Sequence, residues 1–469
     1  MQPFDALLYR GENNPRTRSM LVAVCILDRT PDHARLTEQL ERASRKAPRL
    51  RQRVVSPSLS LLLPSWIIDP DFELGNHLRF TRVGHGATLQ AVLDIVQHEL
   101  AVRLDPALPL WEAQLVEGLR DGTAALIIKM SHAVADGVGL QRLFETIFEH
   151  ERDPQHGPMP RRPIPEDVTP EELTREALAR STVTLSRSAI GLGRGLAGIA
   201  GAVVASPGES MNAAREYLAS VTRLTRTQGP PAPALSGRSA RRRCAAFELP
   251  LAAMKRAGKV AGASINDVYL CGIAGTMQRY LEALQMPVDT LPIAMPVNLR
   301  RGDEPDAGNY FGAISFALPV AITDPRERLA AIHERVRAGR AEPAIGLPQA
   351  VAPLLARLPS QVADELARRT PVPDLQASNV AGSPEPLYLA GAQVLKFWPF
   401  GPVPGVAAMI TMHSQAGVCH IGINFDDAAI TRPELFATSL QRGFQEVLAM
   451  AGPRATRVKR PLLSKGHEA

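Results

Sequence analysis

Length, composition and charge limit the classes of protein that this chain can represent. It has 469 residues, more than one ordinary hydrophobic core organises, so two domains are expected. Lys and Arg outnumber Asp and Glu by 53 to 47. This modest basic surplus suits phosphate-bearing ligands, an anionic membrane surface or simply a solvated face. Aromatic residues make up 5% and do not alternate with basic ones, which argues against a nucleic-acid-binding surface.

Targeting and redox signals are weak. The four cysteines are far apart and form no C-x-x-C pair: Cys25, Cys244, Cys271 and Cys419. This spacing favours a reduced, cytoplasmic protein over a disulfide scaffold or a zinc site. Residues 1–14 lack the pattern of a signal peptide, and no apolar stretch reaches the ~18 residues that span a bilayer. The segment 196–205 is the most membrane-like, and it could touch a membrane surface or pack between domains.

Periodicity in the first third predicts alternating strands and helices. We expect strands over 21–27, 110–116 and 123–130, and helices over 33–47 and 139–150. Pro48 ends the first of these helices. Residues 153–170 are rich in proline and charge and indicate a boundary or crossover.

The remainder continues the mixed pattern after a small-residue segment, 181–224, that we expect to be helical. A second linker, GPPAP, occupies 229–233. We then expect strands over 245–249, 291–297, 313–320, 407–413 and 418–425, and helices over 251–261, 268–284, 326–337 and 433–450. Residues 264–267 carry helix-capping side chains, and Gly339 would stop the helix before it. The sequence therefore predicts two α/β lobes, over 1–170 and 236–469, joined by a helical crossover over 171–235.

One short motif, His132-Ala-Val-Ala-Asp136-Gly137, follows an apolar strand that ends at Met130. Functional side chains are often displayed where a strand gives way to a helix. A histidine there can act as a general base, and Gly137 permits a tight corner. Taken alone, a buried structural histidine is an equally good interpretation.

Further blocks strengthen the catalytic interpretation. They occur in a fixed order: Pro109–Glu112, Glu117–Leu119, Ser131–Gly137, Leu235–Gly237, Asn266–Val268, Pro296-Val297 with Arg300, Gly308-Asn309, and Ser378–Val380 with Gly382. Because it carries these blocks in this order, the chain resembles the bacterial wax ester synthase/diacylglycerol acyltransferase family. The resemblance runs from Asp5 through most of the C-terminal half. It implies two chloramphenicol-acetyltransferase-like lobes (α/β, α+β) with a substrate tunnel at their junction.

The resemblance also implies an activity. Family members transfer a fatty acyl group from acyl-CoA, a co-substrate, to a fatty alcohol or to diacylglycerol, with no bound cofactor and no metal. We therefore expect an acyl-CoA-dependent O-acyltransferase that makes wax ester or triacylglycerol. It would lie in the cytoplasm, with contact to the inner membrane face or to lipid droplets, and without nucleic acid as a partner.

The same resemblance assigns roles to residues. His132 is the expected general base. Asp136 either orients His132 or, as we favour, braces the loop through an arginine such as Arg300. Asn266 assists the carbonyl oxygen, although the local sequence alone favours a helix cap. The expected substrate-binding positions are Ser131, Gly137, Trp111, Ser378 and Asn379, with Trp111 in the core or the tunnel wall rather than in a specific contact.

Two departures from the family pattern stand out. Ser131 replaces the usual first histidine, and Ala381 and Ser383 replace prolines. In an extended segment adjacent side chains point to opposite sides, so Ser131 and His132 should not form a nucleophile–base pair. The serine therefore bears on rate or substrate preference more than on reaction type, and filling space is its favoured role.

Other functions stay open at this point. A condensation-type enzyme that forms amides from carrier-bound acyl groups uses the same histidine motif. A catalytically weak lipid-binding or acyl-CoA-binding relative is the non-enzymatic alternative. The arginines Arg238, Arg241, Arg242 and Arg243 could meet coenzyme A phosphates, a lipid surface or only solvent.

Overall fold

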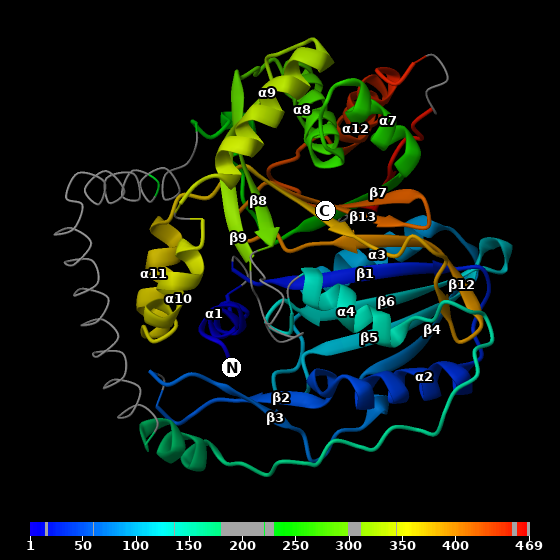
Figure 1. Cartoon of the computed structure of the whole chain (residues 1–469), viewed down its shortest axis with the longest axis vertical. Helices are drawn as coiled ribbons and strands as arrows, with labels where there is room; N and C mark the ends of the chain where they lie inside the picture. The colour runs from blue at the N-terminus through cyan, green and yellow to red at the C-terminus, as the bar shows by residue number, and fades with distance from the viewer. Residues whose placement is uncertain are drawn as a thin grey trace, which may run out of the picture.

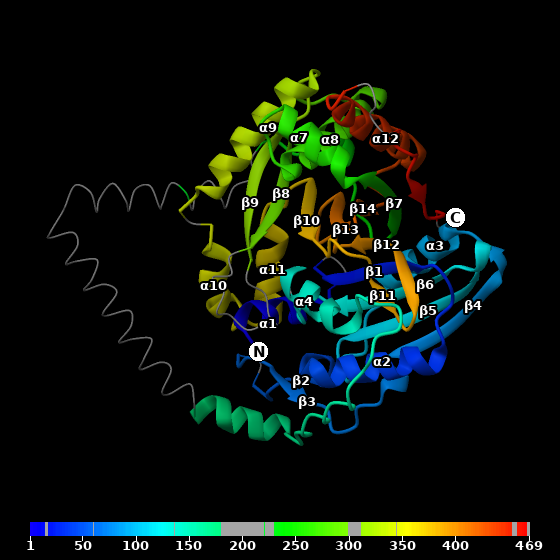
Figure 2. The ribbon, with the colours of Figure 1, turned by 45° about the vertical axis from the view of Figure 1, so that its right-hand side comes forward.

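Two stacked β-sheets with helices on their outer faces make up the molecule (Figures 1 and 2). The computed structural model describes residues 1–14, 17–59, 61–135, 137–179, 220, 229–298, 311–343, 345–452 and 457–466. The helix expected over 181–224 and the apolar segment 196–205 lie outside these residues, apart from Ser220. The mixed α/β class is confirmed.

The first sheet has six strands in the order β11-β12-β1-β6-β5-β4. Their bounds are β1 Met20–Leu27, β4 Leu78–Ala87, β5 Trp111–Leu119, β6 Ala124–Ser131, β11 Tyr388–Leu389 and β12 Ala392–Phe400. Helices α2 (His33–Lys46) and α4 (Gly137–Ile147) pack on one face, and α3 (Leu89–Ala101) packs on the other. The continuous apolar runs of β1 and β6 follow from this coverage on both faces.

The second sheet has seven strands in the order β15-β7-β14-β13-β10-β8-β9. Their bounds are β7 Arg242–Pro250, β8 Thr290–Asn298, β9 Phe311–Pro319, β10 Leu375–Ala381, β13 Ala408–Gln415, β14 Val418–Asp426 and β15 Leu462–Leu463. Its outer face carries α7 (Leu251–Val260), α8 (Ile265–Ala283), α9 (Pro325–Arg340) and α12 (Pro433–Ala449).

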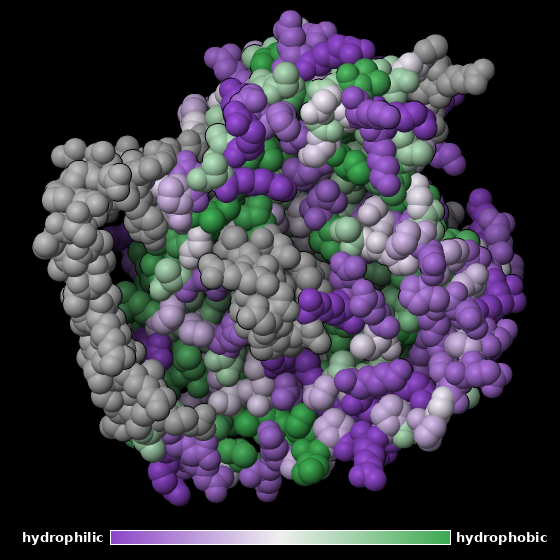
Figure 3. Space-filling model, in the orientation of Figure 1, coloured by the Kyte–Doolittle hydropathy of each residue, from purple (hydrophilic) through white to green (hydrophobic). Residues whose placement is uncertain are grey.

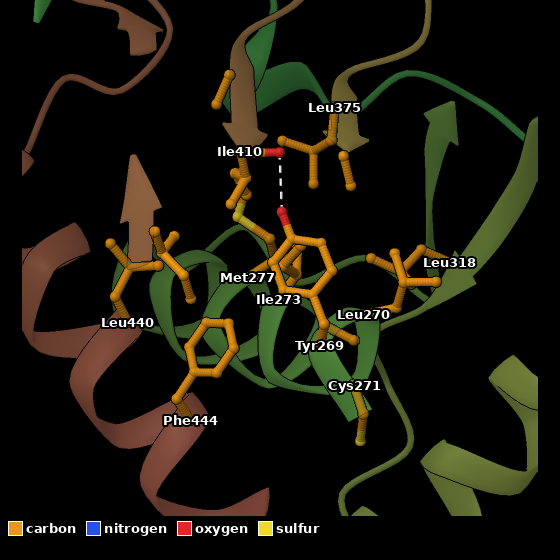
Figure 4. Packing of buried hydrophobic residues seen from close by; sticks show 14 of the residues in the cluster. Tyr269, Leu270, Cys271, Ile273, Met277, Leu318, Leu375, Ile410, Leu440 and Phe444 are labelled. Atoms are coloured by element: carbon orange, nitrogen blue, oxygen red, sulfur yellow. Dashed lines mark hydrogen bonds between the residues drawn. The ribbon is translucent and has the colours of Figure 1, made fainter. Parts of the chain in front are cut away.

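Helix α8 organises the core of this second lobe. It begins with the predicted cap, in which Ser264 and Asp267 bond reciprocally between side chain and backbone. The buried Tyr269 hydroxyl donates to the Ile410 carbonyl of β13 at 2.8 Å, and Phe444 of α12 packs beside it (Figure 4). The helix is therefore fixed to the sheet by a hydrogen bond as well as by apolar contact.

Strand β12 connects the lobes, because the chain leaves the second sheet and returns to the first. It pairs antiparallel with β1, and Trp398 and Phe400 join a core cluster that also holds Cys244 and Ala246 of β7. The backbone of β12 also lies against Gly422 of β14, in the second sheet. A Cβ added at this glycine would fall 1.9 Å from the Pro399 carbonyl oxygen of β12. Only a glycine allows this approach.

The remaining elements lie around the first lobe and the lobe junction. They are α1 Pro3–Gly11, α10 Leu347–Leu355, α11 Ser360–Arg369, a small sheet of β2 Gln52–Val55 and β3 Ser65–Ile68, and the 3-10 helices η1 Pro48–Arg51, η2 Leu74–Asn76, η3 Arg120–Gly122 and η4 Pro233–Leu235. Helix α1 packs against α10 (Figure 1).

The expected elements among the described residues are present, with ends shifted by a few residues. Helix α9 runs through Gly339 rather than stopping before it, because Gly339 packs against Ile314 and the helix ends only at Arg340. The expected lobe boundaries place residues 388–400 in the second lobe, whereas β11 and β12 hydrogen-bond within the first sheet. The division at residues 170 and 235 otherwise stays a prediction.

Replacing Gly422 with alanine tests this contact between the lobes. The new Cβ would collide with the Pro399 backbone, so we expect the free energy of unfolding to fall by about 1–3 kcal/mol in urea denaturation. Gly84→Ala in β4 is the matched control, because a Cβ there meets nothing within 4 Å. Equal denaturation midpoints for both variants and the wild type would contradict the proposed close approach.

Candidate functional site

A cavity of about 310 Å³ lies between the two sheets, beneath β12. Its walls come from β1, β6, α4, β8, β10, β12 and β13. His132 follows the last residue of β6, is half-buried and lines this cavity. Its backbone N–H donates to the Ser19 carbonyl at 2.9 Å, which ties the turn to the strand before β1.

The cavity has two chemically different walls. The first lobe supplies mainly apolar side chains: Leu21, Ala23, Ile128, Met130, Leu140, Phe144 and Phe397. The second lobe supplies a mixed wall, with the polar side chains Gln376, Ser378, Asn379, Thr411 and His413 beside the apolar Pro296, Val297, Val380, Ala381 and Met409. A site of this kind suits a largely apolar ligand with a few oxygen atoms to bind.

Three of these polar groups lie close together on neighbouring strands. Ser378 of β10 pairs in register with Thr411 of β13, and Val380 pairs with His413. The Thr411 hydroxyl is buried and has no hydrogen-bond partner among the described residues. An unsatisfied buried hydroxyl facing a cavity is suited to bind a ligand oxygen.

His413 is a second histidine in the same cavity. It is buried, its ring contacts Phe397 with centroids 4.5 Å apart, and it pairs across strands with the buried His420. Burial lowers the pKa of His413 to about 4 and that of His420 to about 3. Both rings are therefore neutral at pH 7, so His413 can donate or accept a hydrogen bond without carrying charge.

The structure brings together only some of the expected site residues. His132, Ser378 and Asn379 line one cavity. Asp136, Arg300 and Gly308-Asn309 lie outside the described residues, so the proposed Asp136 brace has no observed partner. Gly137 is the first residue of helix α4. Its role at a tight corner stays a prediction.

Trp111 and Ser131 lie away from the cavity. Trp111 is 2% exposed, stacks on His77 and donates its indole N–H to the Leu50 carbonyl at 2.8 Å. It belongs to the core, the first of its two expected placements, and not to a ligand contact. The Ser131 hydroxyl donates to Glu12, and Ser131 is not among the residues that line the cavity. That Ser131 and His132 form no nucleophile–base pair stays a prediction.

Asn266 stands at the second position of α8, and its Nδ2 contacts the Met295 sulfur at 3.1 Å. It is not among the residues that line the cavity. Met295 precedes Pro296, which does line the cavity, so Asn266 lies behind that wall. Its assistance to a carbonyl oxygen stays a prediction.

The basic segment at the start of β7 is used mainly inside the protein. Arg238 donates to the Leu235 carbonyl, Arg242 pairs with Asp426 at 2.9 Å, and Arg243 donates to the Ser464 carbonyl at 2.7 Å. Arg241 is exposed. Arg242 also lines a second cavity of about 180 Å³ with Arg18 and Asn424, and this cavity shares Pro402 with the first.

Sequence reasoning missed several residues of the site. His413 ended a predicted strand, but buried histidines are usually structural, so nothing singled it out. Residues 397–402, the end of β12 and the two residues after it, also line the cavity apart from Trp398, and Pro399 interrupts the strand pattern there.

Within the described ranges, no three His, Cys, Asp or Glu side chains gather as a metal site needs. The four cysteines are buried and free. No helix in the described part of the chain has the length and apolarity to cross a bilayer.

Solved structures share this fold. The wax ester synthase/diacylglycerol acyltransferase from Marinobacter aquaeolei VT8 superposes with a TM-score of 0.61 at 22% identity, covering 92% of this chain and 95% of that one. The first condensation domain of the calcium-dependent antibiotic synthetase gives a TM-score of 0.60 at 14% identity, covering 99% and 98%. At these identities the likeness shows the fold alone, and it confirms the two chloramphenicol-acetyltransferase-like lobes.

Sequence comparisons are more specific. The model of the wax ester synthase/diacylglycerol acyltransferase catalytic domain matches residues 1–269, and the model of the family's C-terminal domain matches 307–447. A protein of Mycobacterium tuberculosis strain H37Rv, named provisionally as a diacylglycerol O-acyltransferase, is 42% identical over 97% of this chain and 93% of its own length. A second protein of that strain, named in the same way, is 33% identical over 90% and 93%. The chain belongs to the wax ester synthase/diacylglycerol acyltransferase family.

Proposed function

We propose that His132 is the general base of this enzyme and that the cavity at the lobe junction is its active site. As a member of its family the enzyme is an acyl-CoA-dependent O-acyltransferase that forms wax ester or triacylglycerol. Acyl-CoA is the donor, and a fatty alcohol or diacylglycerol is the acceptor. The observation that carries the proposal is the half-buried His132 lining a cavity that both lobes build.

The proposed reaction needs no protein nucleophile. His132 takes the proton of the acceptor hydroxyl as the oxygen attacks the thioester carbonyl. The new C–O bond forms and the carbonyl oxygen becomes an oxyanion. The C–S bond then breaks, and the imidazolium returns the proton to the leaving thiolate of coenzyme A.

The two walls support this assignment. Long acyl chains can lie against the apolar wall of the first lobe, where burial from water is favourable. The Ser378 and Thr411 hydroxyls are suited to hold ester or hydroxyl oxygens of the acceptor or donor. Asn379 lies at the exposed end of the same strand. Residues of β12 and α4 line the cavity. We expect them to limit the access of water to the thioester.

Replacing His132 with alanine should remove the base and leave the fold intact. We expect kcat to fall by about 10²–10⁴-fold. Release of coenzyme A from palmitoyl-CoA is measured with dipalmitin and with hexadecanol as acceptors. His85→Ala, at an exposed histidine of β4, is the matched control and should keep the wild-type rate. Near-normal turnover by the His132 variant ends the assignment.

The same assay separates the competing functions. An amide-forming condensation enzyme would use a carrier-loaded thioester with an amine acceptor in preference to palmitoyl-CoA with dipalmitin. A lipid-binding relative would bind acyl-CoA tightly and release no thiol. Acceptor-dependent thiol release that needs His132 excludes both.

Asp136 is proposed to brace the active-site loop and not to orient the base. The variant Asp136→Asn should then lower the melting temperature and the rate together, because the proposed arginine partner would lose its opposite charge. Thermal denaturation and thiol release on the same sample measure both. A variant with wild-type stability that loses only rate supports a triad role.

We further propose that the enzyme works at a cytoplasmic lipid surface. Apolar side chains are exposed on α10 and α11: Leu354 at 70%, Val362 at 49% and Leu366 at 44%. Leu59 and Leu61, in the β2–β3 connection, are also exposed, and Arg10 bonds the carbonyls of both regions, Leu62 and Ala356. In contrast, Figure 3 shows mostly hydrophilic residues over the face around α2 and β4.

Charged substitutions on this surface should prevent lipid binding without changing the chemistry. For the double variant Leu354→Asp/Leu366→Asp we expect at least about tenfold weaker sedimentation with vesicles of phosphatidylcholine and phosphatidylglycerol. Turnover of short-chain soluble substrates should be unchanged. Ile164→Asp, at an apolar residue 84% exposed elsewhere, is the control. Equal sedimentation of all three proteins contradicts the proposal.

A further inference from the structure

A buried carboxyl group outside the cavity contacts the active-site turn. Glu12 follows helix α1 and is 3% exposed. The Ser131 hydroxyl donates a hydrogen bond to Glu12 Oε1, and Ser131 directly precedes His132. The reaction steps proposed above do not involve Glu12.

The Ser131 hydroxyl occupies the centre of the turn that carries His132. It donates to Glu12 and accepts from the Ala133 backbone N–H at 3.1 Å. The Ser131 carbonyl accepts from the Val134 N–H at 3.1 Å, and the Ser131 N–H donates to the Leu110 carbonyl. The bond to Glu12 and the bond from the Ala133 N–H, which follows His132, therefore depend on the orientation of one serine side chain, whereas the two backbone bonds do not.

The groups around Glu12 leave its carboxyl group without a direct cationic partner in the contacts of the described residues. Arg18 donates to the Glu12 and Ala101 carbonyl oxygens of the backbone. Lys129 pairs with Glu99 at 3.0 Å. Arg103 and these two cations act on the carboxylate only through their charge, and Tyr9 is a further titratable neighbour.

Burial outweighs these favourable charges. It raises the pKa of Glu12 to about 7, while the Ser131 hydrogen bond and the charges of Arg103, Arg18 and Lys129 lower it by less. The carboxyl group therefore changes charge in the range where such an enzyme works.

We propose that Glu12 is a positioning residue that acts through the Ser131 hydroxyl to hold the His132 turn in its active arrangement, and does so best when ionised. The proposal rests on His132 being the base. A carboxylate accepts a stronger, charge-assisted hydrogen bond than a carboxylic acid does. Protonation of Glu12 thus weakens the bond that fixes Ser131, and small misplacements of a base cost rate.

This pairing also explains the departure from the family pattern at residue 131. A serine is small enough to lie fully buried against Glu12 and to bond the turn at the same time. In this chain the Ser131 hydroxyl and the Glu12 carboxylate together hold the turn at residue 131, the position where the family pattern usually has a histidine.

The variant Glu12→Gln keeps the shape of the side chain and removes its charge. At pH 8 we expect kcat to fall about five- to tenfold, with KM for palmitoyl-CoA unchanged. In the wild type, ionisation of Glu12 should add a rise in kcat of about five- to tenfold, centred near pH 7, to the rise that deprotonation of His132 gives. The variant should lack this added rise.

Stability should change in the opposite direction, which separates positioning from packing. A carboxyl group whose folded pKa lies above its unfolded value of 4.5 loses its stabilising effect as pH rises towards about 7. The glutamine side chain does not titrate, so the variant does not lose this stability as pH rises. The variant should therefore melt at a higher temperature than the wild type at pH 8, and the difference should shrink towards pH 5.

Three further variants complete the test. Ser131→Ala should lose the same rate as Glu12→Gln, and the double variant should lose no more than either one. Ser131→Thr keeps the hydroxyl and should recover rate. Glu117→Gln, at a buried carboxylate of β5 that pairs with His33 and Arg82, is the matched control and should keep the wild-type pH profile.

The outcomes are distinguishable. If Glu12→Gln kept the wild-type kcat and pH profile while His132→Ala was inactive, the proposed action of Glu12 through Ser131 (the relay) would be overturned. The assignment of His132 as the base would stand. Parallel loss of melting temperature and rate would reduce Glu12 to a packing role, which also overturns the relay. Normal turnover by His132→Ala would instead remove the proposed function on which the relay rests.

Discussion

The return of strand β12 to the first sheet is the constraint on which the rest of the structure depends. Its backbone lies against Gly422 of the second sheet while its edge pairs with β1 of the first. Neither sheet alone encloses the cavity, because His132 comes from one and Thr411 from the other. The short approach at Gly422 therefore sets how far apart the base and the polar wall lie.

The two walls of this cavity differ in their chemistry. The second sheet contributes most of the polar side chains of the cavity, and burial lowers the pKa of His413 to about 4 and that of the neighbouring His420 to about 3, so both stay neutral. A neutral polar wall binds oxygen atoms without the desolvation cost of a buried charge. The first lobe contributes the apolar wall together with the one half-buried histidine. A lipid chain and a reacting hydroxyl can thus be bound in a single space.

Much of the fold could be predicted from sequence, since strongly periodic segments specify their own structure. The runs around β1, β6 and α8 were found within a few residues, and the cap at Ser264 and Asp267 was read from residue type alone. Strand β12 was not found, because Pro399 breaks its pattern and its pairing with β1 joins segments more than 350 positions apart. Long-range pairing of this kind leaves little local trace.

The site was predicted only in part, for related reasons. His132, Ser378 and Asn379 meet in one cavity, whereas Trp111 lies in the core and Asn266 lies behind a wall. Residue type could not distinguish these positions, because each depends on which side of a strand or helix faces the junction. Glu12 carried no signal at all, since its contact with Ser131 joins segments 119 residues apart.

The central claim is that His132 meets the acyl donor in the cavity between the lobes. Affinity labelling tests it most directly, with an acyl-CoA analogue that carries a bromoacetyl group at the thioester position and with peptide mass spectrometry to locate the label. The account predicts one label per chain, on the His132 imidazole, and protection by palmitoyl-CoA. Loss of activity with the label on another residue and His132 unmodified would contradict it.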